Sequence, residues 1–203
     1  MSGPVLTDLA VAADGAAWAA AGFSVASDQL VAGSVRIAFV PGRGIVSWAM
    51  AAVEDGDLDG LETRAGEPPS GSGAEHPNGV IEIDHVVVAT PSLERTRAAL
   101  EAVGIELRRV HEGATGTGAE RRLGFFRVGR PIFEVVEAPE LPPEAPARFW
   151  GITFTTADID AAAELLGERL GRVKDAVQPG RRIATFRREA GLGLPVALIS
   201  PTG

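Results

Sequence analysis

The sequence predicts an α+β protein made of repeated βαβββ units that form mixed sheets. Two observations lead to this prediction. Short β-branched runs alternate with single amphipathic stretches of helical period. The same order of elements, a strand, a helix and three strands, also returns along the 203-residue chain. Repetition of this kind indicates units that share one sheet, because a single unit cannot bury both of its faces.

The middle unit shows this order most clearly. Residues 83–90, IDHVVVAT, are β-branched and predict a strand. Thr90 is suited to cap a helix with Pro91 at its first position, and Gly104 is suited to end it. Strand-like runs separated by Gly-rich turns then follow at 105–112, 121–129 and 131–138.

The last unit repeats this order, and the first unit is a fainter copy. In the last unit a strand at 149–156 precedes a helix that Asp158 caps and Gly171 ends, and strands are expected at 171–178, 181–189 and 194–200. In the first unit a strand and a short helix precede three strand-like runs, at 6–13, 14–22, 23–33, 34–40 and 44–53.

Composition breaks set the expected boundaries. Residues 54–79 are rich in Gly, Pro, Ser and acids and have no periodic apolar face, which indicates a mobile or surface-draped linker. Prolines in 137–148 exclude helix and central strand there. We therefore expect a degenerate first unit at 1–53, a linker at 54–79, a second unit at 80–140 and a third unit at 141–203.

Charge and composition restrict the partners. The net charge of −8 disfavours nucleic acid, which needs a basic face. No apolar run approaches the roughly 20 residues that span a bilayer, and the first residues lack the features of a signal peptide. The absence of cysteine fits a reducing cytoplasm. We expect a cytoplasmic protein, and the preference for Ala, Arg, Gly and Pro over Lys is typical of a GC-rich bacterial genome.

A βαβββ unit with a histidine, His85, in its first strand and a glutamate, Glu134, in its fourth resembles the vicinal oxygen chelate superfamily. That family includes glyoxalase I, methylmalonyl-CoA epimerase, extradiol dioxygenases and bleomycin-resistance proteins. Residues 83–106 look like the opening strand and helix of such a unit, and 131–139 look like its closing strand. The resemblance implies paired units that form a half-barrel, whose concave face holds a divalent metal or, in non-enzymatic members, a ligand alone.

Strand alternation places His85 and Glu134 each on one face of its strand, and it turns Asp84 toward the helix side. If the two strands are neighbours, as the resemblance implies, His85 and Glu134 converge on the concave face as catalytic residues. An imidazole and a carboxylate suit Zn²⁺, Fe²⁺, Ni²⁺, Co²⁺ or Mn²⁺, so both are also candidate metal ligands. Without metal, burial would raise the pKa of Glu134 and suit it to act as a general base.

The third unit supplies neither ligand, because Gly151 aligns with His85 and Leu198 with Glu134. Two ligands then stand where the resemblance implies three or four. A symmetric homodimer would double the pair, or Asp8 of the first unit would add a ligand.

The predicted pocket needs groups that bind an organic ligand. Gly151 is expected to leave space there, and Thr153 and Arg182 are expected to bind substrate through a hydroxyl and a guanidinium. Trp150 is expected to pack beneath the helix, and His76 to be solvated in the linker.

Two functions stay open, and both involve a small-molecule ligand. The first is a glyoxalase-like enzyme, a metal-dependent lyase, isomerase or dioxygenase acting on a small oxygen-rich or carbonyl substrate through His85 and Glu134. The second is a metal-free protein of the same fold that binds or sequesters its ligand. The missing ligands favour binding, and the His85–Glu134 pair favours chemistry. A pocket with only a structural role is the third alternative.

Overall fold

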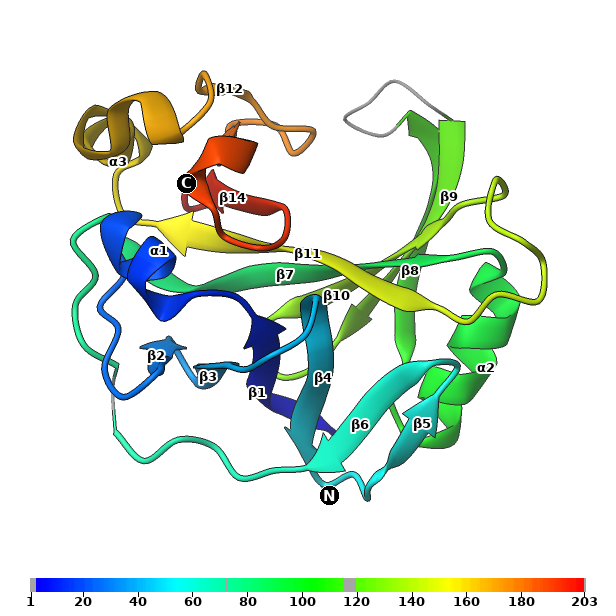
Figure 1. Ribbon diagram of the computed structural model, residues 1–203. Helices are drawn as coiled ribbons and strands as arrows, with labels where there is room; N and C mark the ends of the chain where they lie inside the picture. The colour runs from blue at the N-terminus through cyan, green and yellow to red at the C-terminus, as the bar shows by residue number, and fades with distance from the viewer. Residues whose placement is uncertain (1–2, 72, 115–119, 203) are drawn as a thin grey trace.

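The computed structural model describes residues 3–71, 73–114 and 120–202, and the Gly-rich turn expected around Gly116 lies outside these residues. Figure 1 shows two mixed sheets, with sheet A below sheet B. The strands of sheet A are β1 (Val5–Ala12), β2 (Gln29–Ala32), β3 (Val35–Phe39), β4 (Gly44–Ala51), β5 (Gly56–Leu58) and β6 (Leu61–Ala65). The strands of sheet B are β7 (Val80–Thr90), β8 (Leu107–Ala114), β9 (Glu120–Arg127), β10 (Ile132–Glu137), β11 (Arg148–Thr156), β12 (Lys174–Asp175), β13 (Arg182–Thr185) and β14 (Val196–Ile199). The α+β class is confirmed.

Sheet B consists of two βαβββ units joined at their first strands. Its strand order is β12-β13-β14-β11-β7-β10-β9-β8, and β7 and β11 pair antiparallel at the centre. Each of these two strands also pairs in parallel with the last strand of its own unit, β7 with β10 and β11 with β14. The helices α2 (Leu93–Ala102) and α3 (Ile159–Leu166) provide the crossover that each parallel pairing requires.

The helix boundaries follow capping chemistry. Ser92, rather than Thr90, caps α2, and its Oγ accepts a hydrogen bond from the backbone N–H of Arg95 at 3.3 Å. Asp158 caps α3 as predicted, and its carboxylate accepts from two backbone N–H groups. The α-helix ends at Gly167, which has a φ of 51°, and a 3-10 turn continues to Arg169, so it stops before the predicted Gly171.

Sheet A differs from the predicted first unit. After α1 (Gly15–Ala20), strands β2 and β3 pair with each other and β3 pairs in parallel with β1, whereas β4 lies antiparallel on the other edge of β1. The segment 54–79, predicted to be a linker, contributes β5 and β6 to this sheet. Asp59 and Gly60 join them with φ angles of 57° and 94°, as a two-residue hairpin turn requires. Polar edge strands as short as these carry little apolar periodicity, which is why the composition indicated a linker.

The centre of sheet B recurs in sheet A. The order β2-β3-β1-β4-β6-β5 again has two antiparallel central strands, each flanked by a parallel strand and then by an antiparallel one. Within the described residues, sheet A lacks the outermost strand of each half and has a helix in only one half. The chain therefore has four strand-first units rather than three, and two of them are shortened.

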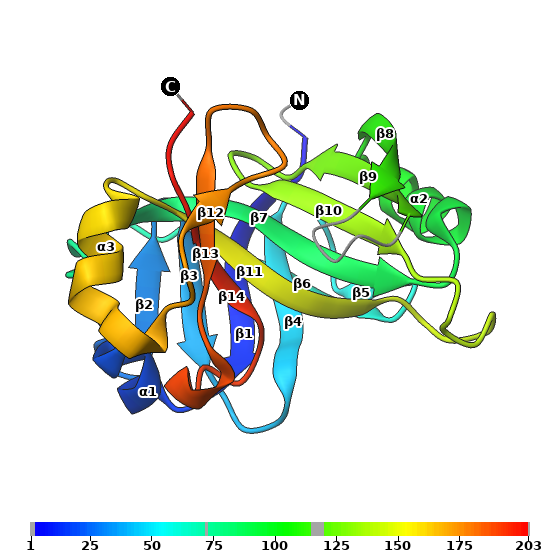
Figure 2. The same ribbon diagram turned by 90° about the horizontal axis from the view of Figure 1, so that it is seen from above.

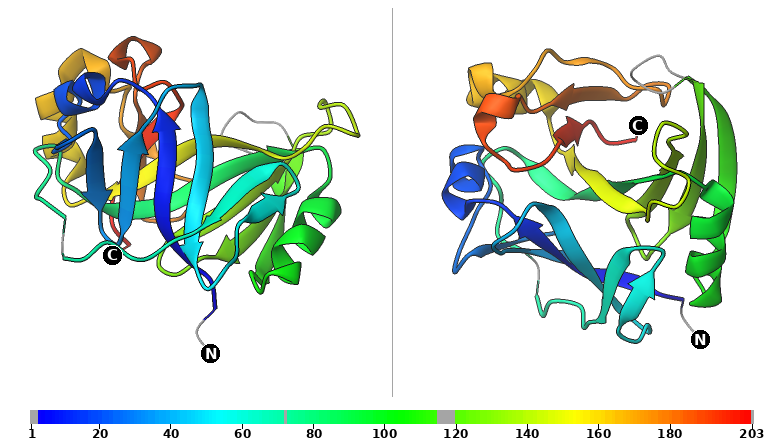
Figure 3. Two further views of the ribbon diagram at one scale, coloured as in Figure 1. Left: turned by 60° about the horizontal axis from the view of Figure 1, so that its bottom comes forward. Right: turned by 45° about the vertical axis from the view of Figure 1, so that its right-hand side comes forward.

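The core lies between the two sheets and beneath α2 and α3. Trp48 of sheet A packs on Phe133 and Phe149 of sheet B, with ring centroids 4.5 and 5.4 Å apart. Trp18 of α1 packs edge-on against Phe154 at 6.1 Å. Aromatic pairs of this kind contribute about 0.5–1.5 kcal/mol each beyond their burial. Figures 1 and 3 show sheet A against one face of sheet B. We call the opposite face the inner face of sheet B; Figure 2 views the molecule from that side.

Residues 73–79 are held against sheet A by hydrogen bonds. His76 is buried, whereas it was predicted to be solvated. His76 is 7% exposed; its Nδ1 accepts a hydrogen bond from the backbone N–H of Ser24 at 3.0 Å, and its Nε2 lies 3.0 Å from the carbonyl oxygen of Val31. Asn78 donates to the carbonyl of Ala21 at 2.9 Å. No helix in the described ranges has the length and apolar character needed to cross a membrane.

Candidate functional site

A β-bulge in β7 places two titratable side chains side by side. His85 pairs with Thr153 of β11, but Ile83 pairs with the next residue, Phe154, so Asp84 is the extra residue on β7. Simple alternation predicted that Asp84 faces the helix side. The structure corrects this, because Asp84 Oδ1 lies 2.7 Å from Nδ1 of His85. The bulge thus presents a carboxylate beside the imidazole.

Asp84 fixes the imidazole of His85. A carboxylate can only accept, so Nδ1 of His85 carries a proton, and Nε2 is directed toward Glu134. The other oxygen of Asp84 accepts from Arg181 Nη2 at 2.6 Å and from Thr155 Oγ1 at 3.2 Å. Arg181 is itself 7% exposed and donates to the carbonyl of Ser200 at 2.7 Å. His85 is therefore held in one tautomer and one orientation.

The charges around Asp84 keep it ionised. Burial alone would raise the pKa of Asp84, but the hydrogen bonds from His85 and Arg181 outweigh burial and lower the pKa to about 2. A group with this pKa is an anion throughout the physiological range. It orients His85 rather than exchanging protons.

Glu134 meets His85 on the inner face, as predicted. In the parallel register Ile132 lies beside His85 and Glu134 beside Val87, so both functional side chains share one face. Oε2 of Glu134 lies 3.9 Å from Nε2 of His85, and the two side chains are 20% and 14% exposed. Burial raises the pKa of Glu134; His85 partly offsets this, and the nearby Asp84 anion adds to it.

The structure separates the two predicted substrate-binding residues. Thr153 is buried on β11 opposite His85, so it belongs to the same face. Arg182 instead makes a two-pronged ion pair with Asp160 of α3, at 2.8 and 2.7 Å, on the helix side of the hairpin. The guanidinium that reaches the His85 network is that of Arg181. Arg181 was expected to begin a strand at 181–189, but it lies just before β13 in the structure.

The two halves of sheet B are equivalent in backbone but not in side chains. Counted back from the helix caps Ser92 and Asp158, His85 corresponds to Gly151. In the same register Glu134 corresponds to Ala197, which lies beside Thr153; Leu198, the residue expected there, is turned to the core. The paired βαβββ units decide the fold. The chain has the vicinal oxygen chelate fold.

The comparisons concern this fold alone. Neither the protein-family models nor the curated proteins include a match to this sequence. A methylmalonyl-CoA epimerase from Mycobacterium tuberculosis is 16% identical with a TM-score of 0.49, over 62% of this chain and 91% of that one. A hypothetical protein from Bacillus halodurans C-125 is 12% identical, with a TM-score of 0.48 and coverages of 60% and 95%. A Streptomyces coelicolor methylmalonyl-CoA epimerase bound to 2-nitronate-propionyl-CoA is 20% identical, with a TM-score of 0.46 and coverages of 60% and 94%.

The donor set of this vicinal oxygen chelate fold does not fit a metal. Zn²⁺ takes about three or four protein ligands, and only Nε2 of His85 and the carboxylate of Glu134 face each other here. Both oxygens of Asp84 are engaged, and in the parts of the chain that the structure describes no group of three His, Cys, Asp or Glu side chains could hold a metal ion. Asp8, which was expected as a further ligand, forms an ion pair with Arg36 on sheet A at 2.5 Å.

The space expected at Gly151 is filled. A Cβ at Gly151 would lie 2.6 Å from the carbonyl oxygen of Pro195, so backbone occupies the room that a side chain would need. Its neighbour Trp150 is 53% exposed and does not pack beneath the helix, because β11 has a second bulge between Phe149 and Gly151.

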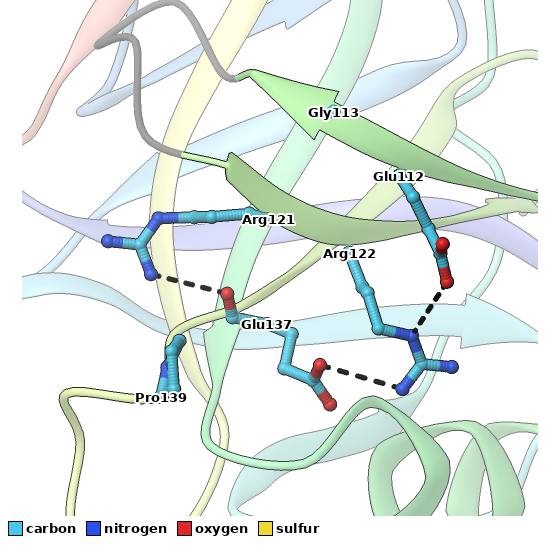
Figure 4. A pocket seen from close by; sticks show the side chains of 6 residues that line it. All are labelled: Glu112, Gly113, Arg121, Arg122, Glu137 and Pro139. Atoms are coloured by element: carbon cyan, nitrogen blue, oxygen red, sulfur yellow. Dashed lines mark hydrogen bonds and ion pairs between the residues drawn. The ribbon is translucent and has the colours of Figure 1, made fainter.

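Two surface hollows of the vicinal oxygen chelate fold lie elsewhere. One, of about 420 Å³, lies at the end of β8 and β9, where Arg121 donates to the carbonyl of Glu137, and where Arg122 lies 3.6 Å from Glu112 and 3.5 Å from the Glu137 carboxylate (Figure 4). The other, of about 560 Å³, lies between the 3-10 turns Gly167–Arg169 and Arg188–Ala190. Acidic and basic side chains line both hollows, and neither lining includes His85 or Glu134, so we take the inner face as the candidate site.

Proposed function

We propose that this protein is a glyoxalase-like isomerase or lyase that moves a proton next to a carbonyl group, with His85 and Glu134 as an acid–base pair and without a metal. The observation that carries the proposal is the 3.9 Å separation of Nε2 of His85 and Oε2 of Glu134 on one face, with Asp84 fixing the imidazole. A dioxygenase needs a redox metal, and the donor set does not support one.

The roles follow from the protonation states. Burial makes the Glu134 carboxylate a stronger base when it is ionised, so it takes the proton from the carbon beside the carbonyl. The electron pair of that C–H bond moves into the carbon skeleton and gives an enolate. The Thr153 hydroxyl, opposite His85, donates to the enolate oxygen. Protonated His85 then gives the proton on Nε2 to the enolate carbon, and Glu134 passes the proton that it took to Nε2, so both groups return to their starting states and isomerisation is complete.

Hydrogen–deuterium exchange tests this function. Small 2-substituted carbonyl compounds are incubated with the protein in D₂O, and loss of the proton beside the carbonyl is followed by NMR. We expect Glu134→Gln and His85→Ala each to slow exchange by about 10²–10⁴-fold. His111→Ala, which removes an exposed histidine on the edge strand β8, is the matched control and should leave exchange unchanged. Exchange that survives both site variants contradicts the proposal.

Ligand binding without chemistry is the second candidate. The exposed Trp150 at the bulge of β11 and the incomplete set of metal ligands favour it. A compound that raises the melting temperature of metal-free protein but shows no exchange supports binding alone. The predicted homodimer is tested by sedimentation of the same sample.

A further inference from the structure

We propose that Arg127 and Arg109 form an anion subsite on the inner face of sheet B, which binds a carboxylate or phosphate group of the ligand. This inference deepens the proposed function. It rests on that function in one respect, because the function defines which end of the ligand reacts. The binding of the anion itself does not depend on that function.

The strand register places Arg127 in line with the candidate site. Arg127 of β9 pairs with Ile132 of β10, and Ile132 pairs with His85 of β7. Cross-strand partners share a face, so the Arg127 side chain starts on the inner face two strands from His85. Neighbouring strands lie about 5 Å apart, so the backbone of Arg127 is about 10 Å from that of His85.

Arg109 follows in the next row of the same face. Glu134 pairs with Phe125 of β9, and Phe125 pairs with Arg109 of β8. The guanidinium of Arg109 lies 4.8 Å from the centroid of the Phe125 ring, a cation–π contact. The apolar side chains of Ile132 and Phe125 therefore separate the two arginines from the His85–Glu134 pair.

The charge balance at these positions favours an external anion. Most arginines near the site are neutralised: Arg181 by Asp84, Arg121 by Glu140 and Arg130 by Glu82. Among the residues whose side chains the structure describes, neither Arg127 nor Arg109 forms an ion pair with a carboxylate.

These positions define the ligand class. Guanidinium groups bind carboxylate and phosphate oxygens through two parallel hydrogen bonds. We infer a small organic acid or phosphate ester whose anionic group lies roughly 5–10 Å from the reacting carbon, with an apolar segment between them.

Titration of the full-length protein with malonate and, separately, with inorganic phosphate tests the subsite. Ionic strength is held constant with NaCl, and Kd is measured by NMR shift changes and by thermal stabilisation. We expect millimolar binding by the wild type and a Kd at least about tenfold weaker in Arg127→Gln and in Arg109→Gln. The stronger of the two anions distinguishes a carboxylate from a phosphate ligand.

Arg130→Gln is the matched control, because Arg130 is 75% exposed and paired with Glu82; its Kd should equal that of the wild type. Three results overturn the subsite: no binding of either anion by the wild type, unchanged Kd in the double variant of Arg127 and Arg109, or equal weakening in Arg130→Gln. Anion binding that needs Arg127 without any proton exchange refutes only the proposed function. Anion binding that is unchanged in the double variant, together with exchange that needs Glu134, refutes only the subsite.

Discussion

Replacing Asp84 by asparagine tests the charge network that holds His85. The pKa of Asp84 falls from 3.8 to about 2 because His85 and Arg181 bind its carboxylate. Each unit of pKa corresponds to about 1.4 kcal/mol, so ionised Asp84 contributes about 2 kcal/mol of stability. Because the folded-state pKa is the lower one, this contribution is present above pH 3.8 and is lost as the pH falls through about 2. The asparagine side chain cannot carry the charge, so the Asp84→Asn variant lacks the contribution at every pH.

The assay is urea unfolding of both proteins at a series of pH values from neutral to 2. We expect a difference in unfolding free energy of about 2 kcal/mol at pH 7, which closes toward pH 2 as wild-type Asp84 becomes protonated. Asp160→Asn is the control, since Asp160 pairs with Arg182 on the surface; its unfolding midpoint should match that of the wild type within error. A difference that stays constant with pH, or an equal loss in the control, would refute the reasoning.

Four further outcomes are expected. Glu134→Gln should raise the melting temperature at pH 7, because it removes a buried charge whose pKa is raised; a lower melting temperature contradicts this burial argument. Lowering the pH below 6.5 should reduce wild-type stability more than that of His76→Gln, because burial lowers the pKa of His76 and protonation then favours the unfolded chain; parallel pH curves would count against it. Gly60→Ala should destabilise the protein by more than about 1 kcal/mol in urea, since φ is 94° and the new Cβ would meet Pro146, whereas Gly56→Ala, in open space, should not. Calorimetric titration with Zn²⁺ or Ni²⁺ should give the same weak heats for wild type and His85→Ala; stoichiometric binding that needs His85 would reverse the conclusion on the metal.

Strand alternation was enough to predict the face of Glu134 but not that of Asp84. Glu134 lies in a regular strand, where a period of two assigns faces correctly. Asp84 lies at a bulge, and an extra residue reverses the assignment for one position. The prediction for Trp150 was wrong for the same reason, because β11 has its own bulge beside it.

Long-range pairing accounts for the other differences. Sequence periodicity identified β4 as a strand, but whether it joins β3 or the far edge of β1 depends on which edge is free in three dimensions. The Asp59–Gly60 turn did carry a readable signal, since Asp-Gly between two short runs is typical of a hairpin. Arg181 lies outside regular structure, so only the fold reveals its contact with Asp84.

The bulge at Asp84 bears on how pairs of a carboxylate and a histidine arise in strands and on how they can be recognised in sequences. In an unbulged strand, adjacent residues point to opposite sides, and a carboxylate preceding His85 would be directed into the apolar layer. Insertion of one amino acid, rather than a substitution, is then the change that brings the two groups together. Surveys of genomes that look for acid–histidine partners two residues apart in strands will pass over pairs made in this way, so adjacent Asp-His sequences merit inspection too.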